Sequence, residues 1–271
     1  MLIKYYGVRG SLPTPGKTTV KYGGNTTCIS LEIDEYQLIV DGGSGLRILG
    51  NDLMKTVFSK GQGKAIFFWS HLHWDHIMGF PFFIPNFIPG NAFVHYGSEK
   101  VETILKRQQD GITFPVEFDK MPSQHTFKVL KPDSVIKLGK ISITTAPLQH
   151  PGGGYAYKFM YQDKSLVIAN DFEQPEQGLD PGLLKLCQGA DILIHDAQYT
   201  NEEYSKGRKG WGHSTWQKAV ELAKVSKIKK LHLFHHDQLH ADSFLEQKIL
   251  LPARKQFTRT YLAREGWKVK V

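Results

Sequence analysis

The stretch Ser70-His71-Leu72-His73-Trp74-Asp75-His76 places four side chains that can bind a metal within six residues. It follows the apolar run Ala65–Trp69, which predicts a strand. Side chains two residues apart point the same way from an extended segment, so His71 and His73 share one direction. Asp75 and His76 then enter a turn or the start of a helix and can face a second position. The spacing therefore predicts two adjacent metal sites.

Three further residues can complete these sites, because each comes just after the end of a predicted strand. His150 follows Ile141–Ala146 in a loop flanked by proline, Asp171 follows Ser165–Ala169, and His235 follows Lys230–Phe234. A rigid sheet can bring loops at its strand ends around one pocket. Taken alone, each residue would suit an ordinary surface or core position. Together with the histidine-rich stretch they predict seven ligands.

The chemistry of this ligand set restricts the metal. Imidazole binds zinc, iron, nickel and copper, and carboxylate also admits manganese. We expect two divalent ions per chain, zinc or manganese first, with iron as a further possibility, and Asp171 as the bridging group. Two ions about 4 Å apart would share a bridging hydroxide and clamp a displacement at phosphorus. Cys28 and Cys187 lie far apart in the sequence, and we expect two buried thiols that bind no metal.

Composition indicates a globular protein. The 271 residues are 41% hydrophobic and 22% charged, which is enough to bury a large core. We expect no signal peptide and no membrane span, hence a cytoplasmic protein. The net charge of +8 favours an anionic substrate or partner, such as a nucleotide or a phosphate ester.

Predicted strands occur in groups with helices between the groups, in both halves of the chain. This order predicts two mixed sheets packed face to face with helices outside, an αββα sandwich, as one domain over residues 1–271. Asp242 and Ser214 are the expected N-caps of the two last helices. The expected strands are Leu2–Tyr5, Cys28–Ile33, Gln37–Val40, Ala65–Trp69, Ala92–Tyr96, Thr126–Leu130, Ile141–Ala146, Tyr155–Tyr161, Ser165–Ala169, Ile192–His195, Lys230–Phe234 and Trp267–Val271. The expected helices are Gly45–Phe58, Glu99–Gln109, Pro181–Cys187, Thr215–Val225 and Ser243–Arg264.

The ligand pattern resembles the metallo-β-lactamase superfamily in order and spacing, over nearly the whole chain. Further motifs resemble its phosphodiesterase branch, which contains ribonuclease Z and cyclic phosphodiesterases. These motifs are Gly7-Val8-Arg9-Gly10-Ser11, Tyr22-Gly23-Gly24-Asn25-Thr26, Val40-Asp41-Gly42-Gly43-Ser44-Gly45 and Gly212-His213-Ser214-Thr215. The resemblance implies the αββα fold, two bound metals and hydrolysis of phosphodiesters.

The resemblance also implies a role for each matched residue. The first metal would be bound by His71, His73 and His150. The second would be bound by Asp75, His76 and His235, with Asp171 as the bridge. Asp75 and His213 are the expected catalytic residues. His213 resembles the ribonuclease Z histidine that meets the scissile phosphate. Asp41 and Asp196 would orient ligand imidazoles through the second ring nitrogen, and a turn aspartate is the alternative for Asp196.

Three features are open between a structural and a functional role. Asn25 could donate to phosphate or build a turn. Arg9 could contact substrate, but pairing with an internal carboxylate is favoured. The aromatic loop Phe80–Pro85 could cover a base or form a homodimer face, and core packing is its default role.

Three functions compete on this basis. We expect a phosphodiesterase acting on small phosphodiesters, foremost 3′,5′-cyclic nucleotides. The first alternative is a ribonuclease Z-like nuclease that processes RNA 3′ ends. It is disfavoured because that enzyme grips tRNA with a long glycine-rich basic arm, whereas Gln174–Gly182 is short and acidic. The second alternative is a di-iron protein that binds oxygen or senses redox state without hydrolysis.

Overall fold

The computed structural model describes residues 1–271 and contains two seven-stranded sheets. Their strand orders are β14-β1-β2-β3-β4-β5-β6 and β13-β12-β11-β10-β9-β8-β7. The first sheet consists of β1 Leu2–Gly7, β2 Cys28–Ile33, β3 Tyr36–Val40, β4 Lys64–Phe68, β5 Ala92–Gly97, β6 Gln124–Val129 and β14 Lys268–Lys270. The second consists of β7 Val135–Leu138, β8 Ile141–Leu148, β9 Gly154–Tyr161, β10 Lys164–Ala169, β11 Ile192–Asp196, β12 Lys230–Phe234 and β13 Thr260–Leu262.

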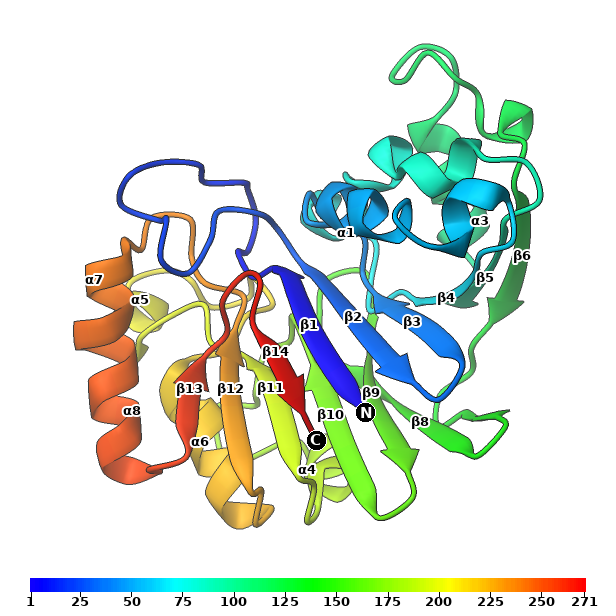
Figure 1. Cartoon of the computed structure of the whole chain (residues 1–271). Helices are drawn as coiled ribbons and strands as arrows, with labels where there is room; N and C mark the ends of the chain where they lie inside the picture. Colours follow the sequence, from blue (N-terminus) through cyan, green and yellow to red (C-terminus); the bar gives the residue numbers. More distant parts are fainter.

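Helices cover the outer face of each sheet, so the layers run αββα as expected (Figure 1). The first sheet is covered by α1 Leu46–Leu53, η1 Val57–Lys60, α2 Trp74–Ile77, η2 Phe80–Phe82, η3 Ile84–Phe87, α3 Val101–Gln108 and η4 Phe118–Lys120. The second sheet is accompanied by α4 Pro181–Cys187, α5 Asn201–Ser205, α6 Trp216–Val225, α7 Asp242–Phe244, the π-helical turn η5 Leu245–Leu250 and α8 Leu251–Gln256.

The layering follows from strands that are apolar on both faces. Phe68 of β4 packs into the layer between the sheets, while its neighbour Phe67 packs under the helices of the first sheet. On β11, Ile192 and Ile194 likewise face the middle layer, and Leu193 faces the outer helices. Alternate residues of a strand point to opposite faces, so a continuous apolar run suits a sheet covered on both sides.

The parallel strands bring the predicted site loops to one edge of each sheet. Strands β3 to β6 run parallel to one another, and so do β10 to β13. The loops after β3, β4, β10, β11 and β12 all leave carboxyl ends of these strands. Carboxyl ends of parallel strands are where open α/β sheets place their ligands.

The last predicted helix, Ser243–Arg264, is too long. The helix ends at Gln256, and β13 then pairs in parallel with β12. Pro252 lacks an N–H, which is consistent with the π-helical turn just before it. Strand β7 was not expected from the sequence either.

Both expected N-caps are wrong by one residue. Thr215, not Ser214, accepts from the Lys218 N–H, because the Ser214 hydroxyl donates to Phe172 O instead. Ala241 occupies the cap position before α7, and the Asp242 carboxylate accepts from the Lys21 N–H at 2.8 Å.

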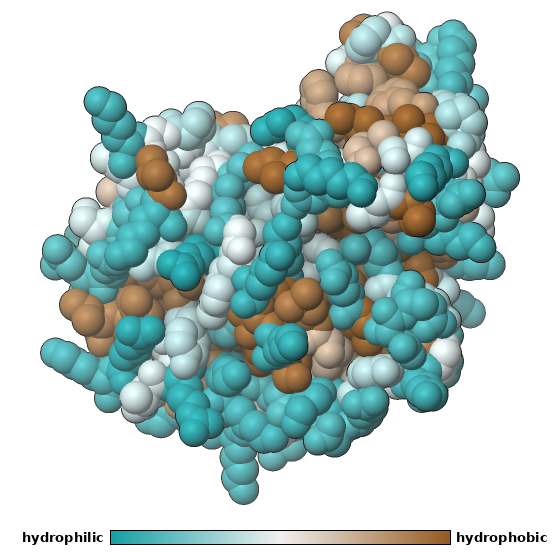
Figure 2. All heavy atoms as spheres, viewed as in Figure 1, coloured by the Kyte–Doolittle hydropathy of each residue, from teal (hydrophilic) through white to brown (hydrophobic).

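The Phe80–Pro85 loop divides its apolar side chains between core and surface. Phe80 and Phe83 are buried under the first sheet, whereas Phe82 and Ile84 are 56% and 41% exposed. Hydrophobic side chains gather on the lobe that carries α1 and α3 (Figure 2). No helix has both the length and the apolar character needed to cross a membrane.

Candidate metal centre

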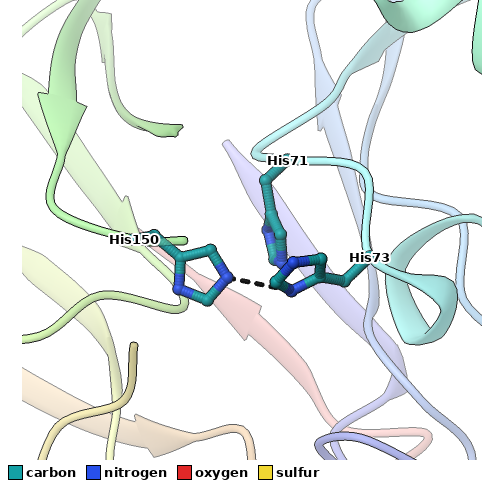
Figure 3. Close-up of side chains that lie close together, drawn as sticks. All are labelled: His71, His73 and His150. Carbon is teal, nitrogen blue, oxygen red and sulfur yellow. Dashed lines mark hydrogen bonds between the residues drawn. The ribbon is translucent and has the colours of Figure 1, made fainter. Parts of the chain in front are cut away.

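Three histidines from both sheets converge on one point. His71 and His73 come from the loop after β4, and His150 comes from the loop after β8. His150 Nε2 lies 3.0 Å from His73 Nδ1 (Figure 3). The buried His71 Nε2 has no hydrogen-bond partner. Converging imidazole nitrogens, one of them unpartnered, fit a bound cation.

A second group lies beside the first and is fully buried. It contains Asp75, His76, Asp171 and His235. His76 Nε2 lies 3.0 Å from Asp171 Oδ2, and His235 Nε2 lies 3.1 Å from both Asp75 Oδ2 and Asp171 Oδ1. Carboxylate and imidazole at these distances again fit a divalent cation, without a thiolate. Both cysteines are buried and free, and neither belongs to a group.

Asp171 connects the two groups. Its Oδ2 lies 3.5 Å from His71 Nε2 of the first group and 3.0 Å from His76 Nε2 of the second. The carboxylate therefore faces both positions, as a bridging ligand would.

The pKa values of His71 and Asp171 suit metal binding. Burial lowers the pKa of His71 well below its usual value, so its ring is neutral and has a free lone pair. Burial would raise the pKa of Asp171, but His235 and His76 outweigh it and hold that pKa well below its ordinary range. Neutral imidazole and ionised carboxylate are the forms that bind metals. At His76, burial lowers the pKa but Asp171, Asp75 and Asp41 outweigh it and raise the pKa well above its usual value, so a metal would displace a proton there.

Most of the imidazoles use their second nitrogen within the protein. His76 Nδ1 lies 2.9 Å from Asp41 Oδ2, His150 Nδ1 lies 2.9 Å from Gly212 O, and His235 Nδ1 lies 2.9 Å from Gln198 Oε1. Each acceptor requires a proton on Nδ1 and leaves the Nε2 lone pair for the centre. His73 is the opposite case, since its Nδ1 faces the group.

Asp41, whose carboxylate contacts His76 Nδ1, also accepts two hydrogen bonds from Ser70. Its Oδ1 accepts from Ser70 N at 2.8 Å and its Oδ2 from Ser70 Oγ at 2.7 Å. Ser70, Gln198 and the Gly212 carbonyl also contact imidazoles of the centre, and the sequence had assigned none of them a role. Only the position of Gln198 just after a strand end could have marked it.

His213 lies beside the second group without being one of the seven residues. Its Nδ1 is 3.1 Å from Asp196 Oδ2, and its ring stacks on His235 with centroids 5.0 Å apart. Burial opposes protonation of His213, but Asp196 outweighs it and raises the pKa to about 9. Asp171, Asp196, His213 and His235 also form a third group that could hold an ion. His213 can thus donate a proton or, alternatively, bind metal.

Two cavities adjoin the centre. The larger, about 370 Å³, lies beside His71 and His73 and is also lined by Lys100, Gly153 and Tyr155. The smaller, about 200 Å³, contains His213 and polar side chains such as Asn201 and Lys218. The larger cavity lies within the size range of small-molecule sites, and the smaller lies below it.

Asn25 and Arg9 both serve the scaffold. Asn25 Nδ2 donates to Glu265 Oε2 at 3.0 Å, and its Oδ1 accepts from Ser44 Oγ at 3.0 Å, which matches the turn-building alternative. Arg9 is fully buried and donates to the carbonyls of Gly23, Asp237 and His240, with Asp242 3.5 Å away. Neither side chain has a polar contact with the seven residues.

Four residues at the centre have left-handed backbones although none is glycine. Their φ values are +60° for Asp41, +47° for Asp171, +59° for His235 and +63° for Ser11. The Ser11 N–H donates to Asp75 Oδ2 at 2.8 Å. Non-glycine residues in this conformation cluster at functional sites.

The αββα fold and the paired histidine and aspartate groups together define a metal-dependent hydrolase of the metallo-β-lactamase fold. Residues 40–236 match the family model described as the β-lactamase superfamily domain. The chain belongs to that family.

Individual proteins are similar to this chain over nearly its whole length. Ribonuclease Z from Picrophilus torridus is 23% identical over 97% of this chain and 93% of its own length. The crystal structure of human tRNase Z, short form, superposes with a TM-score of 0.72 at 19% identity, covering 100% of this chain and 99% of that chain. A diphosphatase from the PhnP family superposes with a TM-score of 0.69 at 19% identity, covering 100% and 97%.

Proposed function

We propose that this protein hydrolyses small phosphodiesters with two divalent metal ions. Zinc and manganese are the metals that we favour. His71, His73 and His150 would hold the first ion, and Asp75, His76 and His235 the second. The observation that carries this proposal is the position of Asp171, whose Oδ2 faces His71 Nε2 at 3.5 Å and His76 Nε2 at 3.0 Å. A shared carboxylate is the arrangement expected of a two-metal centre.

The chemistry divides between the ions and the chain. Two bound ions supply a nucleophile at neutral pH and stabilise charge on the phosphate oxygens. Asp196 holds His213 through Nδ1, which leaves the other ring nitrogen to donate a proton to the departing oxygen. An alkoxide leaves poorly without such a proton. We therefore assign proton donation to His213. Asp75, which would hold the second ion, is the other residue that we propose for catalysis.

We propose 3′,5′-cyclic nucleotides as the first substrates to test. The cavity of about 370 Å³ beside His71 is sized for a ligand of this class, and Lys100 at its wall suits an anion. The net charge of +8 favours anionic substrates in general. We also propose that the exposed Phe82 and Ile84 contact a second copy of the chain, which light scattering would detect.

Ribonuclease Z activity is the second candidate, because curated relatives of 22–25% identity carry the names ribonuclease Z and ribonuclease BN. Against it, the Gln174–Gly182 segment is short and acidic, and β9 and β10 join through a tight hairpin. A nuclease that grips tRNA would need an extended basic surface and would show steep salt dependence.

One substrate panel tests the proposal. It contains cyclic nucleotides, linear dinucleotides, bis-p-nitrophenyl phosphate and precursor tRNA, each assayed with zinc, manganese and iron. We expect turnover of small diesters and little cleavage of tRNA. Site-specific trimming of a tRNA 3′ trailer would replace our proposal with the nuclease. A di-iron spectrum without hydrolysis of any diester would replace both with an oxygen or redox sensor.

A further inference from the structure

The side chain of Gln198 lies at the edge of the His235 ring that is turned away from the centre. Gln198 follows β11 and is only 2% exposed. Its Oε1 lies 2.9 Å from His235 Nδ1. A primary amide can present either oxygen or NH₂ to this nitrogen, and the two orientations have opposite consequences. An oxygen requires His235 to carry its proton on Nδ1, whereas an NH₂ group would force the proton to Nε2.

Asp237 decides between the two orientations. Gln198 Nε2 donates to Asp237 Oδ2 at 3.2 Å and to the Tyr199 hydroxyl at 3.0 Å. An ionised carboxylate accepts hydrogen bonds and cannot donate, so the NH₂ end of the amide must face Asp237. The oxygen then faces His235. Asp237 is itself buried, and its Oδ1 accepts from Leu239 N at 2.8 Å, which fixes the carboxylate.

Gly10 leaves the space for this arrangement. A Cβ atom at position 10 would overlap the His235 ring and come within 2.9 Å of Gln198 Oε1. The backbone at Gly10 and Ser11 is held next to the second metal group. Gly10 N donates to His236 O, and Ser11 N donates to Asp75 Oδ2. The Gly7–Ser11 motif therefore packs closely against the Gln198 amide and the His235 ring.

We infer that Gln198, oriented by Asp237, is a positioning residue that locks His235 in the Nδ1–H tautomer and so directs Nε2 to the second metal group. The inference rests on the proposed metal role of His235. His235 Nε2 lies 3.1 Å from both Asp75 Oδ2 and Asp171 Oδ1, so a proton on this atom would occupy the direction that an ion needs. Partners of this kind raise metal affinity by about 10–100-fold.

The test measures zinc alone, without substrate. Competitive titration gives the dissociation constants of both zinc ions, and nitrogen chemical shifts of chelator-treated protein give the tautomer of His235. Gln198→Leu removes the acceptor but keeps the volume. We expect one zinc ion to bind about 10–100-fold more weakly, the other to be unaffected, and His235 to lose its preference for Nδ1–H. Gln109→Leu is the control, because Gln109 is equally buried but has no contact with the centre.

A swap separates polarity from packing. In the double variant Gln198→Glu with Asp237→Asn, the asparagine NH₂ donates to the glutamate, and the glutamate accepts from His235 Nδ1. The net charge of the pair is unchanged, so we expect zinc affinity and tautomer to return to near wild type. If the swap binds zinc as weakly as Gln198→Leu, or if Gln198→Leu leaves both affinities intact, the inference is wrong. Absence of phosphodiester hydrolysis would overturn the proposed function and leave these two readouts standing.

Discussion

At the scale of single residues, Asp171 is the side chain on which the proposed centre depends most. Asp171→Asn keeps the shape and tolerates the left-handed backbone, but it removes the charge that faces both metal groups. We expect the second ion to be lost and turnover to fall by more than about 100-fold, since an amide is a much weaker bridge. Metal analysis of the purified variant checks this. Two ions and full activity would contradict the bridge.

His213 tests the mechanism separately from metal binding. His213→Ala should retain both metals and the fold, because the seven other residues hold the ions in our proposal. On substrates with an alkoxide leaving group we expect a loss of roughly 10²–10⁴ in rate, the usual range for a general acid. A p-nitrophenolate leaving group needs no proton and should be affected much less. Equal losses on both substrates would indicate positioning, and loss of metal would show that His213 is a ligand.

The sequence pointed to the seven clustered residues because their chemistry is rare and regularly spaced. His71 to His76 lie within six residues, and the other three each follow a strand. Its place just after a strand end was the only sign of Gln198, and Ser70 had no sign beyond its place next to His71. Glutamine and serine are common residues, and here they act only through the three-dimensional position of a neighbour. The same ambiguity left Asn25 open until its amide was seen between Glu265 and Ser44.

At the scale of elements, a largely buried row of hydrogen bonds runs from Trp69, just after β4, to the β6 edge of the first sheet. Trp69 Nε1 donates to His95 Nδ1 at 3.2 Å, His95 Nε2 meets His125 Nδ1 at 2.9 Å, and His125 Nε2 meets Ser123 Oγ at 2.9 Å. Each ring has one donor and one acceptor role in this row. Protonating either ring would set two N–H groups against each other.

This row of hydrogen bonds predicts that the folded state loses stability in acid. Burial lowers the pKa of His125 to about 4, below the ordinary value of about 6.5. The unfolded state therefore binds more protons in this window, and stability is lost as pH falls from about 6.5 towards 4. Burial also lowers the pKa values of His71 and His150, so their protonation destabilises the fold in acid as well. The contribution of His125 is therefore measured by comparing wild type with His125→Gln. We expect wild type to lose up to about 3 kcal/mol more than the variant between these pH values, measured by denaturant unfolding.

The elements themselves were largely predictable. Twelve expected strands correspond to observed ones because their apolar runs are bounded by turn residues, and Cys28–Ile33, Lys230–Phe234 and Pro181–Cys187 have the expected limits. The failures have tertiary causes. Residues Thr260–Leu262 form a strand because β12 offers a free edge, although the preceding helix pattern continues through them. Such pairing between distant segments leaves no mark in a local window.

At the scale of the whole molecule, the metal groups join the two sheets. His71 and His73 extend from the first sheet, while His150, Asp171 and His235 extend from the second. Ions that bind only when both sheets are folded and packed together stabilise the folded state by mass action. We expect zinc at about 100 times its Kd to add about 2.7 kcal/mol and raise Tm, and a chelator to reverse the effect. A Tm independent of zinc would contradict the bridging arrangement.

We further propose that residues 1–271 unfold as one unit, because a single apolar layer draws side chains from both sheets. Circular dichroism and tryptophan fluorescence should then report the same transition midpoint. Two separated midpoints would show that the sheets are independent domains.

The left-handed backbones at Asp41, Asp171 and His235 destabilise the fold at the positions where these side chains are needed. Each non-glycine residue in this conformation costs roughly 1 kcal/mol, a cost that glycine would remove. Asp171→Gly would relieve this cost but would also remove the carboxylate that His76 and His235 contact at 3.0 and 3.1 Å, so we expect the variant to be inert and to melt at a lower temperature than wild type without zinc. At Asp171 the contacts of the side chain therefore outweigh a backbone conformation that glycine would adopt freely.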